Sequence, residues 1–186
     1  MNVYFDTEFT GLHKDTTLIS IGLVTENGDT FYAEFNDYDK TQCDDWIQEN
    51  VINNLYGEER IKELRKTEYN AYVYGNKNEI TEELKLWLDL FKGEEIQFVS
   101  DVCHYDFVLL IDLFGSAFDL PKNINPACYD INQDIARFLD ISNKEAFDKS
   151  REDFLWDYGI NIPGEKHNSL YDAKVIKTIY ELIHNT

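Results

Sequence analysis

The sequence predicts an α/β fold that opens with an antiparallel three-stranded meander. Three segments rich in aromatic and β-branched residues fall at residues 3–10, 18–24 and 30–35. From Asp44 onward, apolar residues recur at helical intervals, and short apolar strands separate the helical segments. The sequence has no repeats, low-complexity segments or breaks in composition, so we expect one domain over residues 1–186.

The first strand is predicted from Val3, Tyr4 and Phe5, which run directly into Asp6 and Glu8. Side chains alternate across a strand, so the two acids emerge on the same face. Adjacent carboxylates at the end of a buried strand repel each other and are costly to desolvate. Mg²⁺ or Mn²⁺ would relieve both problems, because these hard ions take oxygen ligands. An edge strand ending in two solvated acids is the alternative, and this pattern alone leaves both open.

The next two strands follow from a loop and a hairpin signal. Residues 10–15 form a loop rich in turn residues, and residues 18–24 then read as a buried strand. The Asn27-Gly28 pair predicts a tight primed turn, because these residues accept the positive φ values of such a turn. The third strand, at residues 30–35, would therefore return antiparallel to the second.

Helices dominate the rest of the chain. A helix is expected from Asp44, and Asn78 is the expected cap of a second helix that ends near Gly93. Residues 57–78 are charged and rich in tyrosine, and their pattern assigns no structure. The remaining predicted elements are a strand at 96–100, a helix at 104–114, a short strand at 127–129, helical stretches at 131–140 and 144–158, and a final helix at 169–184.

Composition narrows the class of protein. A hydrophobic content of 43% and an aromatic content of 15% exclude a disordered chain. No apolar run approaches the roughly 18 residues of a membrane span. A signal-peptide pattern is absent, and three scattered cysteines in no CxxC spacing are typical of a reduced protein with neither a disulfide nor a zinc site. We therefore expect a cytoplasmic protein.

The net charge of −19 argues against simple electrostatic binding of a polyanion. Nucleic-acid-binding proteins usually carry a basic footprint, and this chain would repel such a partner at long range. A nucleic-acid substrate therefore requires metal ions that reverse the sign of the charge locally. Acidity alone would favour a protein or small-molecule partner.

Two further acids occupy unexpected places on predicted helices. Asp106 falls between Leu109, Leu110 and Leu113 on a helix that is apolar nearly all round. Asp172 projects into the middle of the apolar arc of the final helix. Acids are rarely buried without a partner, so both positions point to a shared site.

Capping is the alternative explanation for Asp172. Ser169 and Asp172 fit the Ser-x-x-acid pattern of a capping box, and an acid suits the positive end of a helix. His167 lies just before this helix, in a loop from which it can reach over the same site. Its ordinary pKa, about 6.5, suits a general base.

These residues resemble the three motifs of the DEDDh exonuclease superfamily. The motifs are Asp6-Thr7-Glu8-Phe9-Thr10-Gly11-Leu12, Tyr105-Asp106 and His167-Asn168-Ser169-Leu170-Tyr171-Asp172-Ala173. The middle motif departs from the common His-Asn-x-x-Phe-Asp form, which leaves Asp101 as an alternative to Asp106. Within the superfamily, residues 4–9, 18–22, 46–51 and 105–115 are similar to the bacterial polyadenylate-specific exoribonuclease AS group.

The resemblance implies a ribonuclease H-like mixed sheet, an antiparallel meander plus parallel strands, flanked by helices. It implies a metal-dependent 3′–5′ exonuclease that releases nucleoside monophosphates from single-stranded nucleic acid, RNA rather more than DNA. Two Mg²⁺ or Mn²⁺ ions would be held by Asp6, Glu8, Asp106 and Asp172, with Asp6 bridging and His167 as the general base. The AS group also implies a homodimer.

Four residues are candidates for substrate binding. Phe9 and Leu12 would stack on or wedge against the terminal bases, or else pack in the core. The backbone near Thr10 would meet the terminal 3′-hydroxyl, and Tyr105 adjoins the middle acid. DNA as the substrate, and a non-catalytic binding or scaffold module of the same fold, remain the alternative functions. A phosphatase or nucleotide hydrolase would need glycine loops or basic clamps, which the sequence lacks.

Overall fold

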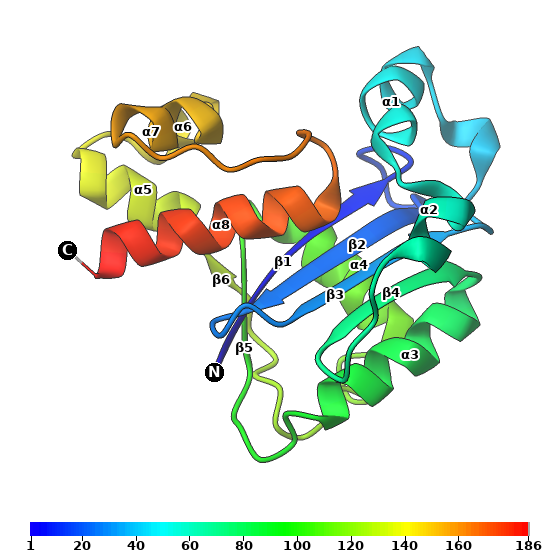
Figure 1. Cartoon of the computed structure of the whole chain (residues 1–186). Helices are drawn as coiled ribbons and strands as arrows, with labels where there is room; N and C mark the ends of the chain where they lie inside the picture. Colours follow the sequence, from blue (N-terminus) through cyan, green and yellow to red (C-terminus); the bar gives the residue numbers. More distant parts are fainter. Residues whose placement is uncertain (186) are drawn as a thin grey trace.

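A mixed six-stranded sheet forms the centre of the computed structural model, which describes residues 1–185 (Figure 1). The strand order is β4-β3-β2-β1-β5-β6, with β1, β2 and β3 antiparallel and the outer three strands added in parallel. The strands are β1 (Asn2–Phe9), β2 (Leu18–Thr25), β3 (Thr30–Phe35), β4 (Asn70–Gly75), β5 (Gln97–Ser100) and β6 (Tyr129–Asp130). The predicted α/β sheet, a meander extended by parallel strands, is confirmed.

Helices cover both faces of this sheet. The helices are α1 (Asp45–Asn50), α2 (Gly57–Glu63), α3 (Lys77–Asp89), α4 (His104–Phe114), α5 (Asn132–Leu139), α6 (Asn143–Asp148), α7 (Arg151–Asp157) and α8 (Ser169–His184), with short 3-10 turns at Lys40–Gln42 and Ile52–Asn54. Within residues 1–185, no helix is both long enough and apolar enough to span a bilayer.

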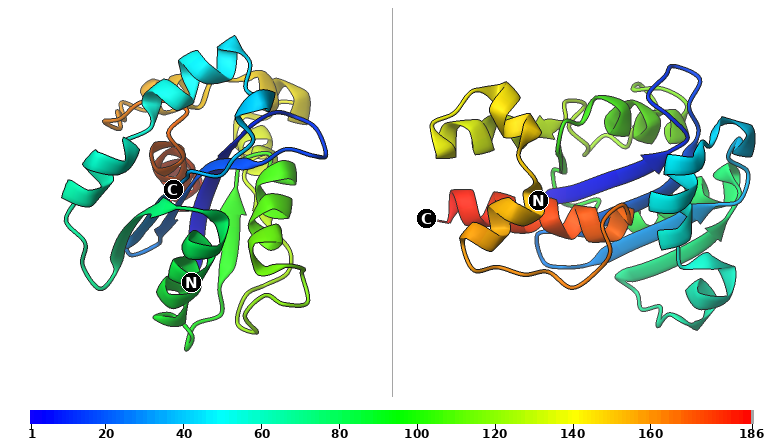
Figure 2. Two further views of the ribbon diagram at one scale, coloured as in Figure 1. Left: turned by 90° about the vertical axis from the view of Figure 1, so that its right-hand side faces the viewer. Right: turned by 90° about the horizontal axis from the view of Figure 1, so that it is seen from above.

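Alternation along β1 decides which helices meet which face. Val3 and Phe5 point into a core that they share with α3 and α4. Tyr4 points to the opposite face, where α5, α7 and α8 build a second core. Figure 2 shows the sheet as the middle layer, with α4 and α8 on opposite sides of it. By the same alternation, Asp6 and Glu8 face the side of α8, whereas Thr7 faces α4.

The first turn of α8 lies directly on β2, and Gly22 is the reason. A Cβ atom at Gly22 would come within 2.4 Å of backbone atoms of Ser169 and Leu170. Gly22 is also the partner of Asp6 in the β1–β2 register. The hydroxyls of Ser20 and Ser169 are 2.9 Å apart and join the same two elements. The start of α8 is therefore fixed beside the end of β1.

Residues 57–78, which the sequence pattern left unassigned, form α2 and the edge strand β4. The next helix begins at Lys77 and is capped by Asn76, so the prediction of Asn78 as the cap is wrong. Asn76 accepts from the backbone of Glu79, whose side chain in turn accepts from the Asn76 backbone. This reciprocal capping box satisfies more backbone donors than a cap at Asn78 would.

The last strand, the helical stretch 144–158 and the β2–β3 turn also differ from the prediction. The last strand is β6 at 129–130 rather than 127–129. The single helical stretch 144–158 is two helices, because Lys149 is extended and Ser150 caps α7 through the Asp153 amide. In the β2–β3 loop, Gly28 has a φ of 91° but Asn27 does not have a positive φ. The loop is therefore not the primed turn that Asn27-Gly28 predicts.

Gly22→Ala should displace the first turn of α8, because the added methyl group meets backbone rather than a flexible side chain. We expect the free energy of unfolding to fall by about 1–3 kcal/mol, as for an overpacked core. Gly93→Ala is the matched control, since a Cβ there meets nothing within 4 Å. Denaturant unfolding of both variants measures the difference, and equal stability would contradict the close contact.

Candidate active site

One cavity of about 800 Å³ is lined by the four predicted acids and the predicted histidine. Asp6 and Glu8 come from the end of β1, where the strand leaves the core. Asp106 comes from the first turn of α4 and Asp172 from the first turn of α8. Segments far apart in the sequence thus bring their carboxylates to one cavity, as the alternation and helical patterns predict. Asp6 and Asp106 line this cavity but lie outside the closest group, which is Glu8, His167 and Asp172.

Asp106 is held by β1 itself. Its Oδ1 atom accepts from the Thr7 amide at 3.1 Å and from the Thr7 hydroxyl at 2.6 Å. Its side chain is 7% exposed, so these two bonds satisfy an oxygen that is shielded from water. Thr7, the residue between the two acids of β1, therefore ties the third acid to the first two.

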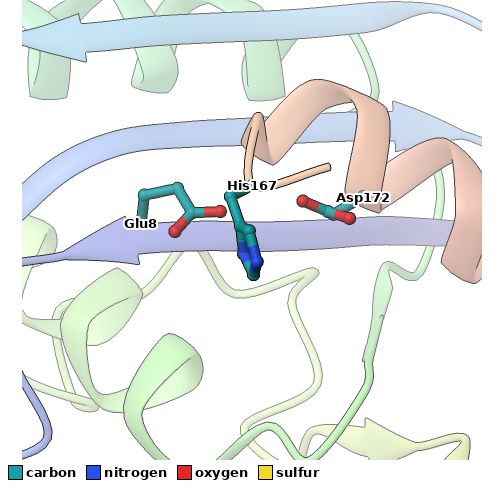
Figure 3. Close-up of side chains that lie close together, drawn as sticks. All are labelled: Glu8, His167 and Asp172. Atoms are coloured by element: carbon teal, nitrogen blue, oxygen red, sulfur yellow. The ribbon is translucent and has the colours of Figure 1, made fainter. Parts of the chain in front are cut away.

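His167 completes the cluster. One ligand atom each from Glu8, His167 and Asp172 lie within 4.8 Å of one another (Figure 3). His167 has a φ of 62°, a left-handed conformation that non-glycine residues rarely adopt. Trp46 of α1 packs edge-on against the imidazole, with ring centroids 5.1 Å apart. These contacts hold a loop histidine over two carboxylates.

A buried polar network supports the loop that carries His167. Asn168 caps α8 by accepting from the Tyr171 amide, and its own amide donates to the Tyr32 hydroxyl at 3.2 Å. Tyr32 donates to the buried carboxylate of Glu34 at 2.6 Å. Since Asn168 is the cap, the alternative in which Ser169 and Asp172 cap the helix is wrong. Asp172 is free to face the cavity.

Burial and mutual repulsion disfavour ionisation of these acids in the metal-free protein. Burial, and next the charge of Asp172, raises the pKa of both Asp6 and Glu8 well above their ordinary values. Burial raises the pKa of Asp106 to about 6, although the bonds from Thr7 oppose the shift. Burial, and next the charge of Glu152, raises the pKa of Asp172 to about 7. A cluster of oxygen ligands whose charges repel fits a divalent metal ion.

The pKa of His167 shifts in the opposite direction. Burial lowers the pKa of the imidazole, and the nearby charge of Lys166 lowers it further. The ring is therefore neutral at neutral pH and can accept a proton. This protonation state suits a general base.

Asp101, the alternative to Asp106, is engaged elsewhere. It lines the cavity, but the Arg151 guanidinium binds both of its oxygens, at 2.5 Å and 2.8 Å. Among residues 1–185, no hydrogen bond joins Asp101 to β1 as the bonds from Thr7 join Asp106 to it. The geometry favours Asp106 as the acid of the middle motif.

The four predicted substrate-binding residues differ in how they are placed relative to the cavity. Leu12 is 78% exposed and lines the cavity, so core packing does not account for it. Phe9 lines the cavity too, but it also packs against the core and stacks on Tyr105 at 5.5 Å. Tyr105 lies with Phe9 and Leu12 in an adjoining cavity of about 410 Å³. Thr10 is buried and does not line the cavity: its hydroxyl donates to Gln42 at 2.5 Å and its amide to the Thr17 carbonyl at 3.0 Å, whereas the neighbouring Gly11 does line the cavity.

Several cavity residues escaped the sequence pattern. Trp46 fits the apolar periodicity of its helix, yet it is 54% exposed, whereas Ile47 beside it is buried. Lys149, Arg151 and Lys166 also line the cavity. The break between α6 and α7 brings Lys149 and Arg151 there, and a Ser-x-x-Asp cap at Ser150 was the one signal for that break.

The family model of the 3′-5′ exoribonuclease Rv2179c-like domain matches residues 1–184. The chain belongs to this family. It is 26% identical over 124 residues to the 3′-5′ exoribonuclease Rv2179c of Mycobacterium tuberculosis, a match that covers 67% of each chain. The enzyme is thus a 3′–5′ exoribonuclease, as predicted, and the alternative of a non-catalytic module is not supported.

Solved structures agree on the fold. The nuclease domain of 3′hExo, a DEDDh family member bound to rAMP, matches with a TM-score of 0.66 and 13% identity, over 99% of this chain and 91% of that one. The Mg²⁺- and Mn²⁺-bound form of S. pombe Pop2p matches with a TM-score of 0.59 and 19% identity, over 99% and 82%. The predicted ribonuclease H-like sheet is confirmed, and one of these neighbours in fold is a DEDDh enzyme. The narrower likeness to the exoribonuclease AS group stays a prediction.

Metal binding should reverse a pH-dependent loss of stability. The pKa of Asp106 is raised to about 6 and that of Asp172 to about 7. Between about pH 4 and about pH 7, the metal-free folded state therefore binds more protons than the unfolded chain. Stability therefore falls as the pH rises through that window. A divalent ion should raise the melting temperature more at about pH 8 than at about pH 5. Each kcal/mol added to the free energy of unfolding corresponds to roughly 2–4 °C.

Thermal unfolding in EDTA and in Mg²⁺ at both pH values tests this expectation. Asp172→Asn should raise the metal-free melting temperature at the higher pH and weaken the response to Mg²⁺. Glu83→Gln, which removes an exposed acid of α3, is the control that should change neither. A metal response of equal size at both pH values would contradict the assignment of these acids as ligands.

Proposed function

We propose that this exoribonuclease hydrolyses single-stranded RNA from its 3′ end by a two-metal mechanism and releases nucleoside monophosphates. One observation carries the proposal: four carboxylates and a neutral histidine line the same cavity. Asp6, Glu8, Asp106 and Asp172 would hold two Mg²⁺ or Mn²⁺ ions. When bound, such ions activate a water molecule and stabilise the charge that develops on the leaving oxygen.

The protein's own groups then have distinct tasks. His167 Nδ1 or Nε2 accepts the proton of the attacking water, because burial keeps the ring neutral. Leu12 and Phe9 wedge against or stack on the terminal bases, and the backbone near Thr10, where Gly11 lines the cavity, meets the terminal 3′-hydroxyl. Thr7 keeps Asp106 in place from the strand that bears Asp6 and Glu8.

Further parts of the proposal rest on resemblance and composition. Preference for adenine and assembly as a homodimer follow from the likeness to the exoribonuclease AS group. A cytoplasmic location follows from the scattered free cysteines, which are typical of a reducing compartment. We also propose that residues 1–186 act as a single exonuclease domain.

Digestion of matched single strands tests the reaction. Poly(A), poly(U), poly(C) and oligo(dA) should be compared in Mg²⁺ and in EDTA, with the released mononucleotides measured by chromatography. We expect metal-dependent release from RNA, fastest from poly(A). Asp6→Asn and Asp172→Asn should each lower kcat by on the order of 10³-fold or more.

Asp112→Asn is the matched control, because Asp112 lies on α4 with Asp106 but pairs with Lys77 at the surface. It should keep wild-type activity. Release in EDTA, or full activity of either cavity variant, would overturn the metal-dependent mechanism. Equal rates on the three RNAs would remove adenine preference and leave a general exoribonuclease.

The pH profile tests His167. A general base must be deprotonated, so kcat should rise with pH and level off above the imidazole pKa, which lies below its ordinary value of about 6.5. His167→Gln should lower kcat by about 10²–10⁴-fold and lose this rise. Measurements at saturating Mg²⁺ keep the carboxylates ionised. A variant that retains the acidic limb would exclude His167 as the base.

A further inference from the structure

The basic groups that line the catalytic cavity gather on its α6–α7 side, although the Lys166 carbonyl accepts from Asn54, just after α1. The chain has 17 basic and 36 acidic side chains. Among residues 1–185, the cations that line the cavity are Lys149, Arg151 and Lys166. Lys149 and Arg151 flank the break between α6 and α7, and Lys166 follows in the loop that leads to α8. The opposite wall, formed by α1 (Figure 1), contributes Asp44, Trp46, Ile47 and Val51.

Arg151 holds this wall together and is fully engaged. Besides both oxygens of Asp101, it donates to the carbonyls of Ala146 and Lys149 at 2.6 Å and 2.8 Å and to Asn132 at 3.0 Å. These bonds satisfy the carbonyls at the end of α6 and join the wall to the end of β5 and to α5. Arg151 therefore fixes the shape of the wall and has no donor left for a ligand at the cavity.

The two lysines, in contrast, have loosely held partners. Lys149 pairs with Asp157 at 3.1 Å, and Lys166 pairs with Glu152 at 3.5 Å. Asp157 is 61% exposed and Glu152 is 32% exposed, so water can solvate each acid when its lysine leaves. One member of each pair is well exposed to water, which screens the attraction and keeps the contribution of the pair to stability small. Both lysines can exchange their partners for the phosphates of a bound strand.

An exposed aromatic ring lies in the same wall. Phe147 of α6 is 59% exposed and lines the cavity two residues before Lys149. Two acids of the wall have cations other than these lysines as partners: Asp148 pairs with Lys144, and Asp101 pairs with Arg151. Aromatic rings beside basic side chains are the usual elements of a single-strand binding surface, because every base has a face that can stack.

We propose that Phe147, Lys149 and Lys166, here called the α6–α7 wall, bind the nucleotides on the 5′ side of the bond that is cleaved. The proposal rests on the proposed function, which places the 3′-terminal nucleotide at the acid cluster. The remaining strand must then leave the cavity, and the α6–α7 wall is the side on which its phosphates meet cations. The lysines contact phosphates, and Phe147 stacks on a base.

Chain length and salt separate this binding surface from the catalytic centre. A dinucleotide reaches the acid cluster only, whereas a single strand of about twelve nucleotides also covers the wall. The wild-type enzyme should therefore have a lower KM for the longer RNA. Lys149→Gln should raise the KM for the twelve-nucleotide RNA about three- to tenfold and remove most of its advantage over the dinucleotide.

The salt dependence gives a second measurement. Loss of one phosphate contact should reduce the slope of log(kcat/KM) against log[KCl] by about 0.7 for the longer RNA. Lys149→Arg keeps the charge and should restore both the KM and the slope. Phe147→Ala should raise the KM for the longer RNA by about tenfold with the slope unchanged, because stacking releases no counterions.

Matched controls come from residues of the same kind outside the cavity. Lys85→Gln removes a lysine of α3 that pairs with an exposed acid, as Lys149 does. Trp156→Ala removes an aromatic side chain of α7 that is 72% exposed. Both should keep the wild-type preference for the longer RNA and the wild-type salt slope.

The outcomes distinguish this inference from the proposed function. If wild type cleaves both RNAs, and Lys149→Gln leaves the length preference and the salt slope as they were, the α6–α7 wall does not bind the strand and the proposed function still stands. If wild type cleaves neither RNA in Mg²⁺ or Mn²⁺, the proposed function fails first. If Lys85→Gln changes the slope as much as Lys149→Gln, the effect is one of overall charge and the wall is again excluded.

Discussion

The close contact between the first turn of α8 and strand β2 is the constraint on which the catalytic centre depends. Gly22, opposite Asp6 in the sheet, leaves room for the helix backbone, and the bond between Ser20 and Ser169 fixes the helix along the strand. Asp172 therefore projects toward the end of β1 in spite of the repulsion between the acids. The two apolar cores on either side of the sheet offset the cost of gathering these charges.

Within residues 1–185, the acidic side chains are paired with cations in some parts of the molecule and unpaired in others. The acids at the centre of the cavity repel one another and suit a divalent ion, whereas two acids of the cavity wall have basic partners. Asp101 with Arg151 and Asp148 with Lys144 show the second pattern. The cavity remains acidic in the absence of metal, since its lining has eight acids and three cations. A polyanionic substrate thus meets repulsion over most of the surface, and bound metal ions would be needed to reverse the sign at the cavity. Such a surface disfavours non-specific binding of duplex nucleic acid.

The sequence predicts what short-range periodicity determines. Strand alternation placed Asp6 and Glu8 together, and the apolar arcs of two helices placed Asp106 and Asp172. Other features depend on competition between partners that periodicity does not register. Asn168 rather than Ser169 caps α8, because Ser169 bonds to Ser20 across the chain.

The same limit applies to the strands and to the cavity rim. Strand β4 lies at the sheet edge, where its partly exposed residues blur the apolar signal of a strand. The exposure of Trp46 depends on how α1 sits over the cavity, which no local pattern encodes. Residues whose environment is set by distant segments are the ones that sequence reasoning misplaced or missed.

The two hydrogen bonds from Thr7 to Asp106 also limit how this acid can coordinate an ion. Both bonds use Oδ1, so Oδ2 is the oxygen that remains, and as a metal ligand Asp106 would offer that one oxygen. Ca²⁺ takes six to eight oxygens and often binds carboxylates through both. Mg²⁺ is satisfied by a few protein oxygens and keeps several waters. A threonine outside the proposed ligand set would thus limit the number of protein oxygens offered to an ion, and with it the choice of ion.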